Sequence, residues 1–302
     1  MPLFCRDYWL DAVAPGAWDA IVLDNAGTPL GAWPFVRHRH LGFEYLQMPV
    51  LTQFLGPWIA YPAGQKQHSR LSHEKDVFTA LIERLPAHDY LIQNFHHSIT
   101  NWLPFHWQGF TQTTRYTYLL DDLRDLDAVH AGFRSNIKTD IKKAKKAVAV
   151  VVTEDLDRFW AVNQKTFARQ DKSPPYSLEL LRRLDTALAA RGQRRIFLAE
   201  DASGAVHAGV YLVWDEHTAY YLMSGGDPAL RSSGATSLLV WDAIQHAATV
   251  TRSFDFEGSM MEPVERFIRA FGATQRPYSQ LAHVGTRKMQ LRLLAEQLLG
   301  RR

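Results

Sequence analysis

Two acidic side chains stand two residues apart in the short stretch FDFEGS, at Asp255 and Glu257. Successive side chains of a strand point to opposite faces, so these two carboxylates would share one face while Phe254 and Phe256 take the other. A carboxylate in a cleft can accept a proton from a substrate or hold a cationic group by charge. A solvated strand end, or an acid that only holds hydrogen bonds within the fold, gives the same pattern. The sequence leaves both interpretations open.

A second stretch suited to chemistry, DPALRSSGATSLLVWDAI, joins an expected strand to an expected helix. An anion there would meet free backbone N–H groups and the positive end of the helix dipole, and a glycine lets the backbone approach closely. The spacing fits Arg/Gln-x-x-Gly-x-Gly/Ala only in part, because a threonine occupies the last small position. An ordinary turn with a serine cap is the alternative. The residues of the predicted pyrophosphate-binding loop are Arg231, Ser232, Ser233, Gly234, Ala235 and Thr236.

The stretch RSNIKTDIKKAKKAVAVVV, residues 134–152, is rich in lysine before it becomes apolar. Its basic residues recur every four positions and its apolar residues recur on another side, which predicts an amphipathic helix. The charged face is either solvated or in contact with the phosphates of a small ligand. Bulk nucleic acid fits less well, because 34 basic against 31 acidic residues leave a net charge of only +3. The lysines that we expect to contact phosphate are Lys138, Lys142 and Lys146.

The second half of the chain has a clear order of elements that would position these stretches. Apolar patterning and turn residues predict a strand, two helices, an antiparallel meander of three strands, a helix, a strand, a helix and a last strand. The predicted ranges are 148–154, 155–170, 177–192, 194–201, 205–215, 219–226, 237–248, 253–259, 262–272 and 273–284. The chain then closes with TRKMQLRLLAEQLLGRR, residues 286–302, which predicts an amphipathic helix.

The first half repeats most of this order. A meander within residues 18–50 is followed by a helix, a strand, a helix and a strand, up to residue 120. The ends of the two halves also align: a phenylalanine precedes a glycine, a threonine and a glutamine in both. Matching order together with these identities predicts a duplicated structural unit. The aligned residues are Phe105, Gly109, Thr111 and Gln112 in the first half and Phe267, Gly272, Thr274 and Gln275 in the second.

A meander, an anion-binding loop, a helix, a strand, a helix and a last strand together resemble the GNAT acyltransferase fold, and two such units in tandem resemble its FemABX-like branch. The stretches RSNIKTDIKKAKK, SFDFEGS and FIRAFGATQRPYSQL strengthen the likeness, which extends from about residue 18 to about residue 285. It implies an α/β (α+β) fold of two units, each a mixed, mostly antiparallel sheet flanked by helices. The expected boundaries are 1–120 for an incomplete unit on the acceptor side, 121–147 for a basic connector helix, and 148–302 for the unit with the donor loop and the C-terminal helix.

The resemblance implies an N-acyltransferase that passes an acyl or aminoacyl group from an acyl-coenzyme A thioester to an amine, such as that of a nucleotide- or lipid-linked cell-envelope precursor. Two departures bear on this. Only residues 172–196 stand where tRNA-dependent relatives often carry a long paired-helix arm, and the first half has PWIAYPAGQKQHSR in place of the donor loop. An aminoacyl-tRNA-dependent peptidyltransferase is therefore the less favoured reading. A non-catalytic binding protein on the same fold is the third.

In such a reaction a base must take the proton of the attacking amine. We expect Glu257 to be that base, with Asp255 sharing the task or holding the acceptor. Many GNAT enzymes use a tyrosine early in the helix equivalent to 262–272, but this helix contains none. By analogy, Tyr221 is the substitute acid and Tyr278 a substrate-binding residue.

Composition sets outer bounds on these readings. With 302 residues, 46% of them hydrophobic, the chain suffices for two domains. The single cysteine, Cys5, excludes an internal disulfide and suits a reducing compartment. The histidines lack the spacing of a metal motif, so no metal is predicted. Neither a signal peptide nor a transmembrane run is evident, so a cytoplasmic location is expected.

Overall fold

The computed structural model describes residues 1–169 and 171–299, and its contacts divide the chain into two units. The first comprises Met1–Arg115 and Pro277–Arg302, and the second comprises Tyr116–Arg276. These boundaries differ from the expected ones, since the basic segment 121–147 lies inside the second unit and the last strand and helix belong largely to the first. Residue 170 and residues 300–302, at the ends of two predicted helices, lie outside the described part.

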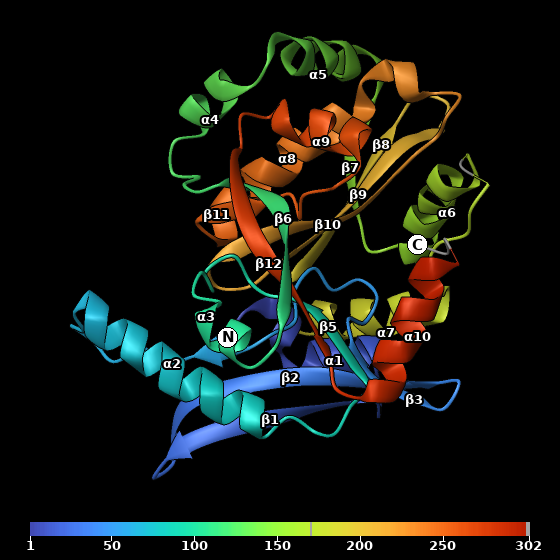
Figure 1. Ribbon diagram of the computed structural model, residues 1–302. Helices are drawn as coiled ribbons and strands as arrows, with labels where there is room; N and C mark the ends of the chain where they lie inside the picture. Colours follow the sequence, from blue (N-terminus) through green and yellow to red (C-terminus); the bar gives the residue numbers. More distant parts are fainter. Residues whose placement is uncertain (170, 300–302) are drawn as a thin grey trace. The chain divides into compact units, whose positions relative to one another are not determined.

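The first unit has a mixed sheet with the strand order β1-β2-β3-β5-β12, and β4 pairs with β2 (Figure 1). All its pairings are antiparallel except that of β3 with β5. Trp33 lies at the centre of its core, where its Nε1–H donates to Gln93 Oε1 at 2.6 Å. The elements are η1 (Leu3–Cys5), α1 (Asp7–Val13), β1 (Trp18–Asn25), β2 (Thr28–His40), β3 (Phe43–Gln47), β4 (Trp58–Ile59), α2 (Gln67–Glu83), β5 (Tyr90–Asn94), α3 (Leu103–Trp107), the end of β12 (Thr274–Val284) and α10 (Arg287–Leu298).

The second unit has the strand order β6-β11-β10-β9-β8-β7, and among its described strands only β10 and β11 run parallel. The order of elements predicted for residues 148–284, including the antiparallel meander β8–β9–β10, is confirmed. Mixed, mostly antiparallel sheets with flanking helices are present in both units, as predicted. The elements are the end of β6 (Thr111–Leu120), α4 (Leu126–Gly132), α5 (Ser135–Ala147), β7 (Ala149–Thr153), α6 (Leu156–Ala168), α7 (Leu178–Ala189), β8 (Arg194–Glu200), β9 (Val206–Trp214), β10 (Thr218–Gly226), η2 (Arg231–Ser233), α8 (Ala235–Val250), β11 (Ser253–Asp255) and α9 (Glu262–Arg269).

Each sheet is completed by a strand from the other half of the chain. In the first unit, Gln280 of β12 pairs with Asn94 of β5. In the second, Leu120 of β6 pairs with Phe254 of β11. Apolar alternation predicts that these segments are strands but does not tell which sheet they join. This exchange is the reason why the observed boundaries cut through β6 and β12.

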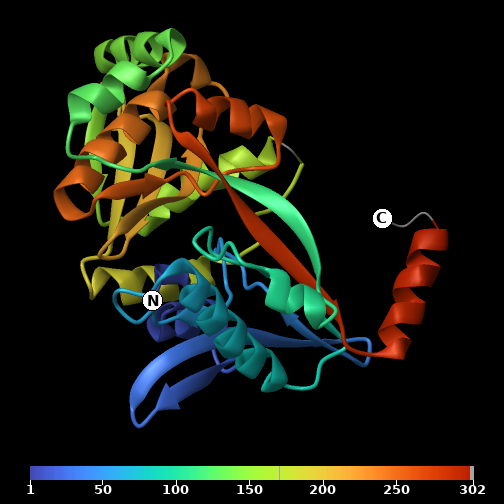
Figure 2. The same ribbon diagram turned by 60° about the vertical axis from the view of Figure 1, so that its left-hand side comes forward.

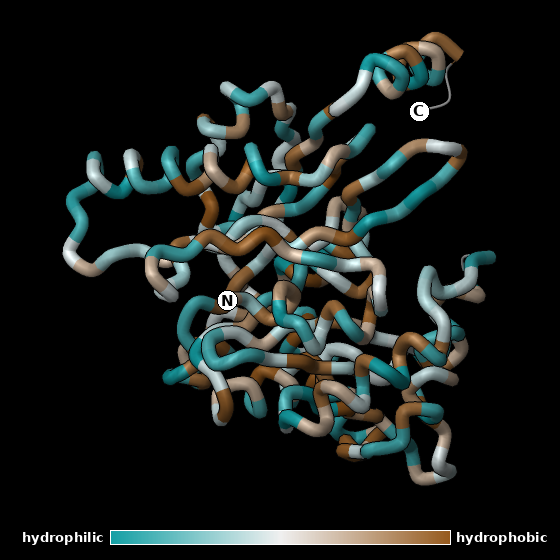
Figure 3. The backbone as a smooth tube through the Cα atoms, turned by 90° about the horizontal axis from the view of Figure 1, so that it is seen from below, coloured by the Kyte–Doolittle hydropathy of each residue, from teal (hydrophilic) through white to brown (hydrophobic). Residues whose placement is uncertain are grey.

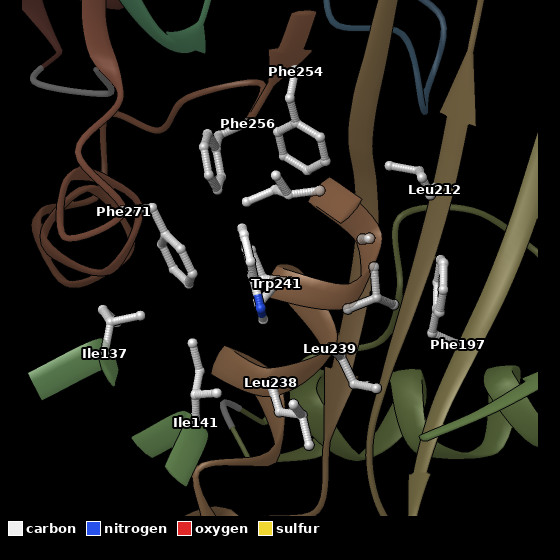
Figure 4. Close-up of a cluster of buried hydrophobic side chains, with 14 of the residues drawn as sticks. Ile137, Ile141, Phe197, Leu212, Leu238, Leu239, Trp241, Phe254, Phe256 and Phe271 are labelled. Atoms are coloured by element: carbon white, nitrogen blue, oxygen red, sulfur yellow. The ribbon is translucent and has the colours of Figure 1, made fainter. Parts of the chain in front are cut away.

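Helix α8 is the buried centre of the second unit (Figure 4). Phe197 and Leu212 of the sheet lie on one side of it, and Ile137 and Ile141 of α5 lie on the other. A helix that is apolar on most of its circumference must be covered on several sides. The position of its first turn is therefore fixed by packing against both the sheet and α5. Among the described residues, no helix is long and apolar enough to span a membrane.

Candidate functional site

The parallel strands β10 and β11 separate at their carboxyl ends. They pair at only three positions, the last of which joins Tyr220 to Asp255. Strand β10 then continues to Gly226, with a bulge between Tyr221 and Met223, whereas β11 ends at Asp255. In open α/β sheets, ligands bind beyond the carboxyl ends of such strands. The separation therefore leaves an edge of β10 that a ligand can approach.

The predicted anion-binding loop lies directly after β10, at the N-terminus of α8. Gly234 is the N-cap with φ of +79°, in the left-handed region that glycine tolerates best. Ser233 Oγ accepts from the backbone N–H of Ala235 at 3.3 Å. No described residue accepts from the backbone N–H of Thr236 or Ser237. The first turn of a 16-residue helix thus offers free N–H groups and its positive dipole end to an anion.

Helix α5 packs against this loop through the side that carries Asp140 and Lys143. The lysines that recur every four residues lie on another side of the helix. A Cβ atom on Gly234 would lie 2.6 Å from the backbone oxygen of Asp140. The carboxylate of Asp140 accepts from Ser237 Oγ at 3.4 Å, and Lys143 Nζ donates to the backbone oxygen of Ser232. Lys143 was not identified from the sequence as a neighbour of the loop. Its position could have been inferred, because Asp140 and Lys143 lie three residues apart on either side of the buried Ile141 and therefore belong to the packed side of the helix.

The three lysines chosen from the sequence lie elsewhere on α5. Lys138 Nζ donates to the backbone oxygen of Ala131 at 2.8 Å, where it closes the end of α4. Lys142 and Lys146 are exposed. None of the three lines the cavity described next, so their contact with substrate phosphate stays a prediction.

A cavity of about 440 Å³ opens beside the loop, within the second unit. Two arginines, the first turn of α8, a tyrosine of β10 and an apolar side of α9 surround it. It brings Tyr221 together with three residues of the predicted loop, while Ser232, Ser233 and Ala235 do not line it. The lining residues are Asp140, Arg169, Tyr221, Ser224, Arg231, Gly234, Thr236, Ser237, Pro263, Val264, Phe267 and Ile268.

Helix α6 holds the end of β10 at the cavity. Asn163 Nδ2 donates to the backbone oxygen of Ser224 at 2.9 Å, and Thr166 Oγ1 accepts from the backbone N–H of Gly226 at 2.9 Å. Arg169, the C-cap of the same helix, reaches the cavity lining. Sequence reasoning missed this arginine, because it stands past the end of the apolar stripe and in no motif.

Tyr221 presents a neutral phenol to the cavity. Burial raises the pKa of Tyr221 to about 12, and its hydrogen bond with the Ser224 side chain lowers that pKa only in part. Its ring packs against that of Phe256, with the ring centroids 6.3 Å apart. At neutral pH the Tyr221 hydroxyl therefore remains a hydrogen-bond donor.

Asp255 organises the turn that follows β11. It is 1% exposed and its carboxylate accepts from Thr117 Oγ1 and, at 2.7 Å, from the backbone N–H of Glu257. Strand β11 ends at Asp255, and Glu257 has φ of +60°, so Glu257 is positioned by a left-handed turn and not by strand alternation. The turn continues through Gly258, where a Cβ would lie 2.0 Å from Tyr116 O. Asp255 thus has the structural role that the sequence left open, and its catalytic role stays a prediction.

Glu257 has an unusual environment for a carboxyl group. Burial raises the pKa of its carboxyl well above the ordinary value, and the nearby charge of Asp255 raises it further. Its Oε1 atom is buried, and no described residue donates a hydrogen bond to it. Non-glycine residues with positive φ are uncommon and concentrate at functional sites. The raised pKa, the partnerless Oε1 atom and the positive φ set Glu257 apart, and its role as the base stays a prediction.

The remaining predicted residue, Tyr278, falls in the first unit and does not line this cavity. Glu257 does not line it either, although it follows Phe256, the ring partner of Tyr221. Among the described residues, no group of three or more histidine, cysteine, aspartate or glutamate side chains is placed to hold a metal ion.

Residues 131–263 match a family model described as an acetyltransferase (GNAT) domain, a range that includes α5, the loop and Glu257. The fold is similar to that of FemX, with a TM-score of 0.65 and 12% identity over 92% of this chain and 91% of that one. It is also similar to a tandem GNAT protein from the clavulanic acid biosynthesis pathway, with a TM-score of 0.52 and 13% identity over 90% and 85%.

A third similar structure is the C-terminal domain of a putative lysylphosphatidylglycerol synthetase from Agrobacterium fabrum, with a TM-score of 0.54 and 12% identity over 93% and 89%. A search of curated proteins by sequence gives no match. The predicted resemblance to tandem GNAT proteins of the FemABX-like branch is confirmed at the level of the fold.

Proposed function

We propose that this tandem GNAT protein is an N-acyltransferase that binds a coenzyme A thioester in its second unit and transfers the acyl group to an amine. The observation that carries the proposal is the cavity of about 440 Å³, because it joins a helix N-terminus with free N–H groups to the open edge of β10. A pyrophosphate and a thioester need these two features, respectively. An acyl-coenzyme A molecule carries both groups.

The loop would hold the anionic end of the donor. The backbone N–H groups of Thr236 and Ser237 can donate to pyrophosphate oxygens at the positive end of α8. Arg231 and Arg169 add positive charge at the same cavity. Val264 and Phe267 of α9 provide an apolar wall for the uncharged arm of the donor.

The chemical step would take place where β10 and β11 separate. The lone pair of the amine nitrogen forms a bond to the thioester carbon, the C–S bond breaks, and the thiolate leaves. Glu257 accepts the proton that the amine must lose. The neutral hydroxyl of Tyr221 donates a hydrogen bond to the leaving sulfur, by analogy with the tyrosine of other GNAT enzymes. No covalent enzyme intermediate is required.

The acceptor is an amine, and a nucleotide- or lipid-linked cell-envelope precursor is the form that we favour. Lys142 and Lys146 are exposed and available to phosphates of such an acceptor. Aminoacyl-tRNA is the alternative donor, and a protein that binds without turnover is the alternative function. Both are separated by the following experiment.

Binding of coenzyme A, acetyl-coenzyme A and a charged tRNA to the full chain is measured by calorimetry, beside a Thr236→Glu variant. A glutamate in the first turn of a helix stabilises it by about 0.3–1 kcal/mol through the helix dipole. The same charge would repel a pyrophosphate. We therefore expect affinity for coenzyme A to fall at least about tenfold while the melting temperature is unchanged or raised.

Thr249→Glu, at the opposite end of α8, is the matched control. It should lower stability slightly and leave coenzyme A affinity unchanged. Equal affinity of the Thr236→Glu variant and the parent would remove the donor from this cavity. Binding of charged tRNA alone would favour the peptidyltransferase, and coenzyme A binding without turnover of any amine would favour the non-catalytic protein.

A further inference from the structure

The last helix, α10, carries an uncovered apolar stripe. Leu291, Leu294 and Leu298 are 68%, 50% and 88% exposed, and their spacing of three and four residues places them on one side of the helix. The opposite side packs on the first unit through Met289, which is 1% exposed. Figure 2 shows α10 in red leading on from β12, and Figure 3 shows hydrophobic and hydrophilic turns alternating along it. The proposed acyl transfer uses none of these leucines.

The turn between β2 and β3 adds a further exposed apolar side chain next to the start of α10. Leu41 is 71% exposed at this turn and has φ of +50°. The two elements are in contact, since Lys288 Nζ lies 4.2 Å from the centroid of the Phe43 ring and the Arg292 guanidinium lies 4.9 Å from it. The exposure of a leucine side chain to water at the tip of a turn does not stabilise the fold. Its exposure beside a second exposed stripe marks an interaction surface.

This surface carries an excess of positive charge. Five basic residues lie on these elements, against the acids Glu44 and Glu296 and the neighbouring Asp89, which leaves an excess of two. The basic residues are Arg37, Arg39, Arg287, Lys288 and Arg292. Glu44 is paired with Arg39 at 3.3 Å, Glu296 with Arg292 at 2.8 Å, and Asp89 accepts from Thr286 Oγ1 at 2.6 Å. Leucines in a cationic surround are the composition of helices that lie in the interface of a bilayer with anionic lipids.

We propose that the first unit docks on an anionic lipid bilayer through the leucine stripe of α10 and the β2–β3 turn. Charge complementarity selects this occupant. A second copy of the chain, placed symmetrically, would bring two cationic surfaces together. Nucleic acid would match the charge but would leave the leucines in water. A bilayer surface can bind both groups, because the leucines would be buried among the acyl chains while the basic residues would contact the headgroup phosphates.

The contribution of each part can be separated in a vesicle co-sedimentation assay on the full chain. Vesicles of phosphatidylglycerol mixed with phosphatidylcholine are compared with phosphatidylcholine alone. We expect binding to the anionic vesicles that weakens as salt is added. The triple variant Leu291→Gln, Leu294→Gln, Leu298→Gln should bind at least about tenfold more weakly.

Two further variants make the assay specific. Arg287→Glu with Lys288→Glu should weaken binding to anionic vesicles by at least about tenfold, since one basic residue near such a surface contributes about fivefold. The control replaces three other exposed apolar residues of the first unit, which are somewhat less exposed than the leucines of the stripe, with glutamine. It should bind as the parent does. The control positions are Val22, Leu71 and Leu103, which are 57%, 42% and 49% exposed.

The proposal fails if the parent stays in the supernatant with anionic vesicles at low salt, or if the control variant loses as much binding as the leucine variant. It also fails if light scattering finds a dimer that the leucine substitutions convert to a monomer, because a second copy would then cover the stripe. Melting temperatures of all variants identify any that are unfolded.

Discussion

Both units contain one parallel strand pair, β3 with β5 in the first and β10 with β11 in the second, and the space beyond each pair is used differently. In the second unit this space adjoins a cavity. In the first, the chain itself enters it: Leu55 N–H donates to the backbone oxygen of Asn94 at 2.8 Å, and Asn94 Nδ2 donates to that of Gln53 at 3.0 Å. A segment of protein thus occupies in one unit the place that we assign to a ligand in the other.

The connecting segments account for this difference. Residues 227–234 lead from β10 to α8 in a tight path that ends in a left-handed glycine. The longer segment 48–66 leads from β3 to α2, whose N-cap, Lys66, makes no side-chain cap hydrogen bond. A long connection can fold back over the strand ends, whereas a short one leaves them open. The comparison teaches that two units with similar sheets differ in the length of the segment that follows the parallel strands, and that this length decides whether the strand ends are covered.

The first unit has a cavity of its own, of about 510 Å³, but it lies at the other end of the parallel pair. His88 and Asp89, which precede β5, line it together with His283 and Thr286 of the last segment. These side chains bond to one another, with 2.9 Å between the two imidazoles and 2.6 Å between Asp89 and Thr286. This cavity is therefore not the counterpart of the cavity beside α8, in which we propose that the donor binds.

The largest effect is expected from filling the space at Gly234. A Cβ there would lie 2.6 Å from Asp140 O and would also be forced into the left-handed region, so Gly234→Ala should lower the free energy of unfolding by about 3 kcal/mol. Gly226→Ala is the control, because its Cβ would have no neighbour closer than 3.9 Å. Denaturant unfolding measures both. Equal stability of the two variants would show that the loop does not depend on its contact with α5.

The next effect concerns turnover. Glu257→Gln keeps the size of the side chain but removes the base, so we expect the rate at neutral pH to fall at least about tenfold. The loss should shrink at high pH, where the substrate amine deprotonates unaided. Glu262→Gln, on an exposed residue at the start of α9, is the control. Equal rates across the whole pH range would transfer proton removal to water or to Asp255.

A smaller effect on coenzyme A affinity should distinguish a basic residue of the loop from a basic residue on the exposed side of α5. Arg231 lines the cavity and Lys142 does not, so Arg231→Glu should lower coenzyme A affinity about fivefold and reduce its salt dependence. Lys142→Glu changes the net charge equally and should alter that affinity less than about twofold. A similar loss in both variants would indicate a general field of the protein rather than a contact at the loop.

The sequence was sufficient for what depends on local pattern. Apolar spacing predicted the order of elements, and the position of Gly234 before an apolar helix predicted the loop. What it could not supply depends on packing between distant segments. The four-residue lysine repeat located a charged side of α5 but not the side, with Asp140 and Lys143, that meets the loop. Likewise, no local signal tells that β12 completes the first sheet.

The smallest effect is a pH dependence of stability that belongs to Glu257. Its pKa is raised above the ordinary 4.5 in the folded chain, so folding favours the protonated form. The stabilisation from protonation is complete below pH 4.5 and is lost as pH rises through the folded pKa. Carboxyls with lowered pKa, such as Asp201 and Glu265, make stability rise with pH instead. They are present in the parent and in the Glu257→Gln variant alike, so the difference in melting temperature between the two proteins reports on Glu257 alone. We expect the melting temperature of the variant to exceed that of the parent by about 2 °C or more at neutral pH, with the gap closing toward pH 4.5. A constant gap at all pH values would mean that Glu257 ionises as it does in water, and it would then lose its qualification as the base.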